Sequence, residues 1–354
     1  MTQRFTVIVA SDRYAGQDND FTVERRLLEA FPDIEVELFA DPARDEEKLI
    51  ELGQRADALI LSTRDAVTRA LCERIPRVKV IARYGVGLDN ADLDAAADNG
   101  IVITHYPQYC TNEVADHATA LILTLNRRIV ELNEDLHTGA WSKKGRSTTN
   151  ILRGPLHGMH ASTVGIVGLG RIGKAVAARI RPFGARILVH DPYIDSSEIH
   201  GAGGEPVSLE GLVVGSDYIT LHCPLTPETR GLLGPDEFAR MKSTVAIVNT
   251  CRGPVINEAA LIDFLRATPG ARAALDVTEV EPLNGESPLW DLPNVILTPH
   301  SAYYSIESAK IVRDHTFLSA VAVLRGYQPR TVANPAVLDK VDLKPWVESA
   351  TGHA

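Results

Sequence analysis

Short apolar runs alternate with amphipathic segments along the first hundred residues. Runs of about four to eight apolar residues, separated by segments of helical periodicity, are typical of parallel strands connected by helices. The pattern therefore predicts a parallel sheet covered by helices. The apolar runs are residues 5–10, 34–40, 58–62, 78–85 and 101–106.

A second series of apolar runs follows, at residues 164–167, 187–190, 218–223, 245–250, 273–277 and 295–300. A chain of 354 residues also exceeds the usual size of one domain. We therefore expect two α/β domains. The pattern between the two series predicts a helix over residues 113–129, which could bridge them. Its expected apolar face consists of Val114, Ala118, Leu121, Leu125 and Ile129. Another helix is predicted over residues 308–326, crossing back to the first domain.

The first strand of the second series leads into Gly168, Gly170 and Gly173, which have the spacing G-x-G-x-x-G. Between a strand and a helix, such glycines allow a tight turn, the close approach of a pyrophosphate and close helix packing. The anion lies at the helix N-terminus. Asp191 ends the next strand, at about the twenty-residue offset where an acid accepts hydrogen bonds from the ribose. The sequence predicts a dinucleotide site, with a purely structural turn as the alternative.

We therefore expect two Rossmann-like parallel-sheet domains. Residues 108–303 are predicted to form an NAD-binding Rossmann domain with an extended arm at about 131–153. Residues 1–107 and 304–354 are predicted to form a discontinuous, flavodoxin-like substrate domain.

The net charge of −10 and the pI near 5.6 provide no basic field for nucleic acid. No apolar run approaches the length of a signal peptide core or a membrane span, so we expect a cytosolic protein. The four cysteines are far apart in sequence and predict neither a disulfide framework nor a zinc site. His157 and His160 have no cysteine or carboxylate nearby to complete a metal set, and we expect no metal.

Polar and ionisable residues recur at the carboxyl ends of the second series of strands, where open α/β sheets bind ligands. Arg252 offers a planar fork of donors suited to a carboxylate and an adjacent carbonyl oxygen. His300 can exchange a proton with an oxygen as a hydride moves, and Glu281 can favour its protonated form. The alternatives are a surface arginine, a core or capping histidine and a solvated glutamate.

Other strand ends add candidates. Asp276 could bind the nicotinamide carboxamide or cap a turn. In the first domain, residues 83–92 (RYGVGLDNAD) place Gly85 and Gly87 after a strand, where backbone N–H groups could bind a substrate carboxylate; a simple turn is the alternative. Tyr84, Tyr106 and Tyr303 are candidates for an aromatic pocket wall.

These residues and their order resemble the D-isomer-specific 2-hydroxyacid dehydrogenases from about residue 50 to 335. The motifs are RYGVGLDN, NEVADHATALIL, VGIVGLGRIGKAVA, HDPY, LHCPLTPETRGLL, IVNTCRGPVINEAALIDFL, ALDVTEVEP and NVILTPHSAYYS. Within the family, HDPY, LHCPLT and PHSAYYS look closest to the C-terminal-binding-protein group and related hydroxypyruvate or glyoxylate reductases.

The resemblance implies catalytic roles for Arg252, Glu281 and His300, and a homodimer built through the cofactor domain. The cofactor contacts that it implies are Val114, Gly168, Gly170, Arg171, Ile172, Gly173, Asp191, His222, Cys223, Thr250, Cys251 and Asp276. The substrate contacts that we expect are Tyr84, Gly85, Val86, Gly87, Arg252 and Tyr303.

Three positions differ from related groups. Tyr303 stands where the C-terminal-binding proteins have tryptophan, so their substrate preference does not carry over. His117 lies in a segment that lacks the glutamate-threonine pair of that group. Glu281 stands where the related formate dehydrogenases use glutamine, which argues against formate.

We therefore predict an NAD(H)-dependent enzyme that interconverts a small 2-keto acid and its D-2-hydroxy acid. One alternative is an NAD-responsive, corepressor-like binding protein. Another is a dehydrogenase of a different small anion such as phosphite.

Overall fold

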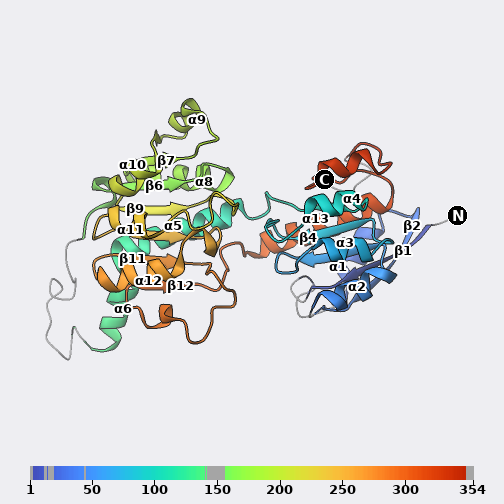
Figure 1. Ribbon diagram of the computed structural model, residues 1–354, viewed down its shortest axis with the longest axis horizontal. Helices are drawn as coiled ribbons and strands as arrows, with labels where there is room; N and C mark the ends of the chain where they lie inside the picture. The colour runs from blue at the N-terminus through green and yellow to red at the C-terminus, as the bar shows by residue number, and fades with distance from the viewer. Residues whose placement is uncertain are drawn as a thin grey trace. The chain divides into compact units, whose positions relative to one another are not determined.

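The computed structural model describes residues 3–11, 14, 20–43, 45–139, 141 and 156–347 (Figure 1). The chain divides into two compact units. The first consists of residues 1–109 and 305–354, and the second of residues 110–304. Of the predicted arm at about 131–153, only residues 131–139 and 141 lie within the described residues.

The first unit contains a five-stranded parallel sheet with the order β2-β1-β3-β4-β5. This is the flavodoxin-like order of doubly wound α/β folds. The strands are β1 (Gln3–Val9), β2 (Ile34–Ala40), β3 (Ala58–Ser62), β4 (Val80–Tyr84) and β5 (Val102–Thr104). The helices are α1 (Thr22–Leu28), α2 (Glu46–Arg55), α3 (Arg69–Arg74), α4 (Leu93–Asp98) and α13 (Ile306–Leu324).

The second unit contains a seven-stranded parallel sheet with the order β12-β11-β10-β9-β6-β7-β8, the Rossmann order with one more strand at the edge. The strands are β6 (Thr163–Val167), β7 (Arg186–His190), β8 (Glu205–Pro206), β9 (Tyr218–Leu221), β10 (Ala246–Asn249), β11 (Arg272–Leu275) and β12 (Val295–Leu297). The helices are α5 (Thr111–Arg127), α6 (Ile129–His137), α8 (Arg171–Ile180), α9 (Ser196–Gly201), α10 (Leu209–Gly215), α11 (Pro235–Arg240) and α12 (Glu258–Ala267). Together the two sheets confirm the predicted α/β class.

Each sheet is buried on both faces, because alternate residues of its central strands enter different hydrophobic cores. Along β1, Val7 and Val9 belong to one core and Ile8 to the other. Along β10, Ile247 belongs to one core and Val248 to the other. Runs of successive apolar residues in these strands are therefore buried on both faces of the sheets, as their sequences predict.

Helix α13 lies beside β4 although the two are distant in sequence (Figure 1). The Thr316 hydroxyl donates to the Arg83 carbonyl oxygen at 3.4 Å. Arg313 donates from Nε and Nη2 to the fully buried Glu24 carboxylate, at 2.7 and 2.9 Å. These contacts hold α13 against α1 and β4 within the first unit.

One expectation about the 113–129 helix is wrong. Its first four apolar positions are buried on α5, but Ile129 is 54% exposed. Arg128 is in the left-handed region with a φ of 51°, which ends α5 and starts α6 in a new direction. The apolar periodicity continues through Arg128 in the sequence, so only the backbone turn removes Ile129 from the buried face.

Among the helices of the described ranges, none is both long and apolar enough to cross a membrane.

Candidate active site

The glycine-rich turn connects β6 to α8. Gly168 has a φ of +88°, and a Cβ atom there would lie 2.8 Å from the Cys223 backbone nitrogen. A Cβ atom on Gly173 would lie 2.1 Å from the Gly168 carbonyl oxygen, so the helix packs too closely for any side chain. Gly170 precedes α8, and a Cβ atom there would meet nothing within 4 Å. The turn is therefore closed toward the protein at its first and third glycines and open at the second.

The open side of this turn coincides with the N-terminus of α8, where Arg171 and Ile172 are the first helical residues. The free N–H groups of a helix start and its positive dipole end favour an anion. A pyrophosphate fits this position because Gly170 leaves the backbone uncovered. Val114 is buried in the first turns of α5, and α5 is joined to α8 by an ion pair of Arg179 with Asp116 at 2.6 Å.

Asp191 follows β7 and holds the glycine-rich turn directly. Its Oδ2 atom accepts a hydrogen bond from the Leu169 N–H at 2.7 Å, and Oδ1 accepts from the Tyr193 N–H at 3.0 Å. Each carboxylate oxygen has a second lone pair for another donor. The acid thus lies beside the turn, where the ribose hydroxyls of a bound dinucleotide would be.

Two buried polar atoms at neighbouring strand ends have no hydrogen-bond partner among the described residues: His222 Nδ1 after β9 and Thr250 Oγ1 after β10. Burial lowers the pKa of His222 to about 3, so its ring is neutral at physiological pH. The other ring nitrogen, Nε2, lies 2.9 Å from the Thr220 hydroxyl. Since buried polar atoms are normally paired, these two atoms suit contacts with a bound cofactor.

The second sheet brings Arg252, Glu281 and His300 to one edge. They follow β10, β11 and β12, which are consecutive neighbours in the sheet and run parallel, so their carboxyl ends lie together. The loop after β10, which carries Arg252, contacts the loop after β11, which carries Glu281. A Cβ atom added to Gly253 would lie only 1.9 Å from the Thr278 carbonyl oxygen.

His300 and Glu281 form a direct pair. The distance from His300 Nδ1 to Glu281 Oε2 is 2.6 Å, and both side chains are about three-quarters buried. A carboxylate at this distance can accept a hydrogen bond from Nδ1–H and so orient the ring. The Tyr303 ring lies edge-on to the imidazole, with centroids 6.3 Å apart. With Nδ1 engaged, Nε2 is the nitrogen that remains for a proton exchange.

The backbone of His300 has a φ of 52°, unusual for a residue with a side chain. Asp276 holds this conformation, because its carbonyl oxygen accepts the His300 N–H at 2.8 Å. Its carboxylate accepts the Ser301 and Ala302 N–H groups, each at 3.0 Å. The same carboxylate accepts the Thr298 hydroxyl at 2.5 Å.

Asp276 was expected either to bind the cofactor or to cap a turn, and the structure shows that its carboxylate caps the segment around His300. His117 is connected to Asp276 through Thr298, because His117 Nε2 lies 3.2 Å from the Thr298 hydroxyl that Asp276 accepts. Sequence reasoning did not select Thr298. Its place two residues before His300, at the end of β12, was the only available signal.

Asn249 shapes the turn that carries Arg252. Its side-chain Oδ1 accepts the Cys251 N–H at 3.0 Å, and Nδ2 donates to the Arg252 carbonyl oxygen at 2.9 Å. One guanidinium nitrogen, Arg252 Nη1, donates to the Cys251 carbonyl oxygen at 2.7 Å.

In the first unit, the predicted loop after β4 is held by the fully buried Arg83, which donates to the Asn90 side chain at 2.6 Å. Gly85 packs on Thr63, and the Val86 carbonyl oxygen lies 3.0 Å from His105 Nδ1. Gly87 follows in the same loop. The contacts order this backbone, and its predicted role in carboxylate binding stays a prediction.

The three tyrosines have different neighbours within their own units, and their predicted role as a pocket wall stays a prediction. Tyr84 packs edge-on against Tyr14, with ring centroids 5.3 Å apart. Tyr106 stacks on His315 at 3.8 Å. Tyr303 belongs to the second unit, beside His300.

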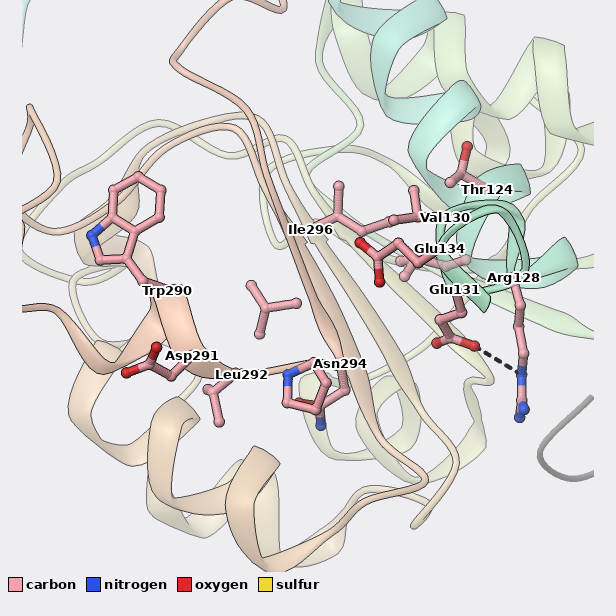
Figure 2. Close-up of a pocket in the computed structure, with 13 residues that line it drawn as sticks. Thr124, Arg128, Val130, Glu131, Glu134, Trp290, Asp291, Leu292, Asn294 and Ile296 are labelled. Atoms are coloured by element: carbon pink, nitrogen blue, oxygen red, sulfur yellow. Dashed lines mark ion pairs between the residues drawn. The ribbon is translucent and has the colours of Figure 1, made fainter. Parts of the chain in front are cut away.

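Figure 2 shows a pocket of the second unit away from the predicted site residues, with a volume of about 290 Å³. It is lined by the end of α5, by α6 and by the segment from Trp290 to Ile296. Arg128 Nε and Glu131 Oε2 form an ion pair there at 3.7 Å (Figure 2). Of the described residues, none that we predicted as a site residue lines this pocket. The described residues also contain no group of three or more histidine, cysteine, aspartate or glutamate side chains able to hold a metal ion.

The chain is similar to known proteins along most of its length. Residues 119–302 match the family described as D-isomer specific 2-hydroxyacid dehydrogenase, NAD binding domain. A glyoxylate reductase of Thermococcus litoralis is 37% identical over 314 residues, 88% of this chain and 94% of that protein. The crystal structure of a glyoxylate reductase from Paecilomyes thermophila superimposes with a TM-score of 0.79 at 28% identity, covering 94% of this chain and 98% of that one.

A D-3-phosphoglycerate dehydrogenase of Mycobacterium leprae is 35% identical over 305 residues, 86% of this chain and 56% of that protein. The chain thus spans little more than half the length of the phosphoglycerate dehydrogenases that it matches. Together with the fold and the geometry at the strand ends, these similarities confirm the family that the sequence motifs indicated: the chain belongs to the D-isomer specific 2-hydroxyacid dehydrogenases.

Proposed function

We propose that the protein is an NAD(H)-dependent oxidoreductase that interconverts a small 2-keto acid and its D-2-hydroxy acid. The observation that carries the proposal is the 2.6 Å contact between His300 Nδ1 and Glu281 Oε2, at the sheet edge that also carries Arg252. A proton donor and a fixed cation at the carboxyl ends of a Rossmann sheet are what reduction of a charged carbonyl compound requires.

When bound, the dinucleotide supplies or accepts the hydride. Arg252 holds the substrate carboxylate and polarises the neighbouring carbonyl oxygen through its guanidinium donors. In the reducing direction, protonated His300 donates from Nε2 to that oxygen, and Glu281 stabilises the charged ring before the transfer. In the oxidising direction, neutral His300 accepts the hydroxyl proton. Asp276 positions the imidazole indirectly, because its carboxylate binds the backbone N–H groups of the two residues that follow His300.

Glu281→Gln is expected to shift the pH profile of reduction. The amide keeps a hydrogen-bonding group near Nδ1 but removes the negative charge that favours the imidazolium. Reductive activity should therefore decline at lower pH than in the parent. The measurement is kcat/KM for keto-acid reduction across pH, with Glu279→Gln as the control because Glu279 is exposed and only two residues away. A Glu281→Gln profile that superimposes on the parent's would show that Glu281 does not tune His300.

We expect a preference for NADH over NADPH of at least about tenfold in kcat/KM, since juxtaposed like charges cost several kcal/mol. Asp191 lies where the ribose would be, and a 2′-phosphate there would meet its negative charge. Pro192 and the 85% exposed Tyr193 add no positive charge. Comparing both cofactors with one keto acid tests this, and equal values would remove Asp191 from the proposed role.

We further propose a homodimer formed through the second unit. Three large apolar side chains on or near α6 and the Figure 2 pocket are half exposed: Ile129 (54%), Leu136 (46%) and Trp290 (55%). Such residues next to a hollow are typical of a surface that another chain covers.

Light scattering should therefore give twice the chain mass of 38.5 kDa. Trp290→Glu should shift the protein toward the monomer, whereas Phe39→Glu, which changes an exposed aromatic residue of the first unit, should not. A monomeric parent would contradict the proposal.

The direct test of the proposed function is NADH oxidation with a panel of 2-keto acids that includes glyoxylate, hydroxypyruvate and phenylpyruvate. Steady turnover of at least one of them is expected. Cofactor binding without turnover of any panel member would instead favour a binding protein, and turnover of phosphite alone would change the substrate class. The closer likeness to the C-terminal-binding-protein group, the extended arm at about 131–153 and the cytosolic location stay predictions.

A further inference from the structure

Two cysteines follow neighbouring strands of the second sheet. Strands β9 and β10 are parallel neighbours, and their register pairs Leu221 with Asn249. Cys223 and Cys251 each follow these paired residues by two positions, and both pack in the same hydrophobic cluster of the second unit. Neighbouring strands lie about 4.7–4.9 Å apart, within the range of about 4.4–6.8 Å between Cα atoms that a disulfide spans.

The two thiols are already in contact. The two side chains lie close enough for each to shift the pKa of the other: Cys251 lowers the pKa of Cys223, and Cys223 helps to raise the pKa of Cys251. The Cys251 thiol also donates to Asn249 Oδ1 at 3.1 Å, which fixes its position. Both cysteines are free thiols.

We propose that Cys223 and Cys251 are an oxidation site, at which a peroxide converts the two thiols into a disulfide that blocks cofactor binding. The Cys223 thiolate attacks one oxygen of the peroxide, the O–O bond breaks, and a sulfenic acid and water form. The Cys251 sulfur then attacks the Cys223 sulfur, the S–O bond breaks, and a second water leaves. Two electrons pass from the two sulfurs to the peroxide, and the two thiol protons end in water.

The environments of the two sulfurs suit these different roles. The neighbouring Cys251 side chain lowers the pKa of Cys223, which favours the attacking thiolate. Burial raises the pKa of Cys251 well above its ordinary value, so Cys251 remains the protonated partner until the sulfenic acid forms.

A disulfide here would act on both parts of the site. The Cys223 backbone packs closely against Gly168, since a Cβ atom added there would lie 2.8 Å from the Cys223 nitrogen. A shift of Cys223 toward Gly168 would therefore displace the glycine-rich turn. The Cys251 carbonyl oxygen accepts from Arg252 Nη1, so a shift of Cys251 moves the arginine. This consequence for the cofactor rests on the proposed function, whereas disulfide formation itself does not.

The experiment treats the reduced full chain with a small excess of hydrogen peroxide, blocks the remaining thiols with an alkylating agent and digests with trypsin. A cross-linked pair of peptides, residues 187–230 with 243–252, is expected, and a dithiol should release it. NAD+ added beforehand should slow its formation. NADH titration followed by fluorescence should show an affinity at least tenfold weaker for the oxidised protein, with recovery after reduction.

Three variants sharpen the test. Cys251→Ser should form no cross-link and should accumulate a Cys223 sulfenic acid that dimedone traps. Cys223→Ser should form neither product. Cys110→Ser, which alters a buried cysteine outside the pair, should form the cross-link as the parent does.

Peptides in which Cys223 and Cys251 are oxidised separately, without a cross-link, would overturn the proposal. Equal NADH affinity of the reduced and cross-linked proteins would overturn its effect on the cofactor. If the reduced protein fails to bind NADH at all, the proposed function fails, and the peptide masses still decide whether the disulfide forms.

Discussion

His300→Ala should lower the rate of keto-acid reduction by about 10²–10⁴-fold while leaving NADH affinity nearly unchanged, because general acid catalysis contributes on that scale. The imidazole follows β12 and is paired with Glu281, whereas the glycine-rich turn and Asp191 follow β6 and β7. Removing the ring therefore removes the proton donor without disturbing the expected pyrophosphate and ribose contacts.

Single-turnover reduction and NADH titration on the same preparation measure the two effects separately. His160→Ala is the matched control, because His160 is an exposed histidine of the same unit. If His300→Ala reduced a keto acid at the parent rate, another group would have to deliver the proton. If it lost NADH binding as well, the histidine would act mainly in folding or cofactor binding.

Arg252→Lys should lower kcat/KM for keto-acid reduction at least tenfold although the charge is retained. A lysine ammonium cannot form the two parallel hydrogen bonds of a guanidinium, and hydrogen bonds to charged groups contribute about 1.5–3 kcal/mol each. Lysine would also lose the Nη1 contact with the Cys251 carbonyl oxygen, which orients the arginine in its turn.

The control is Arg240→Lys, an exposed arginine that pairs with Glu210 at 3.1 Å. It should keep the parent rate. A folded Arg252→Lys variant that binds NADH and turns over the keto acid at a near-normal rate would point to a different anchor for the carboxylate.

Local sequence patterns were sufficient for several features of the protein. The first three residues of β10 (AIV) are apolar at successive positions, and only a strand covered on both faces buries them all. The glycine spacing identified the turn before α8, because two of its three positions exclude any side chain. Arg252, Glu281 and His300 were selectable because each follows an identifiable strand, and parallel strands bring their carboxyl ends together.

Other features depend on contacts between residues distant in sequence. Arg128 has no local signal that it adopts a left-handed conformation, yet this residue divides the predicted helix and exposes Ile129. The sequence left two roles open for Asp276. The carboxylate accepts the N–H groups of Ser301 and Ala302, twenty-five and twenty-six residues later, and only the folded chain brings these groups to it.

The sequence by itself determined the α/β class, the glycine-rich turn and the three residues of the proposed chemistry, because periodicity and spacing act over short distances along the chain. Only the tertiary structure decided how His300 is held, with its φ of 52° maintained by Asp276 and its ring by Glu281. It also decided that Cys223 and Cys251, twenty-eight residues apart, become neighbours. The physical reason is that hydrogen bonds and strand register depend on which strands lie side by side, and this order follows from packing the whole sheet.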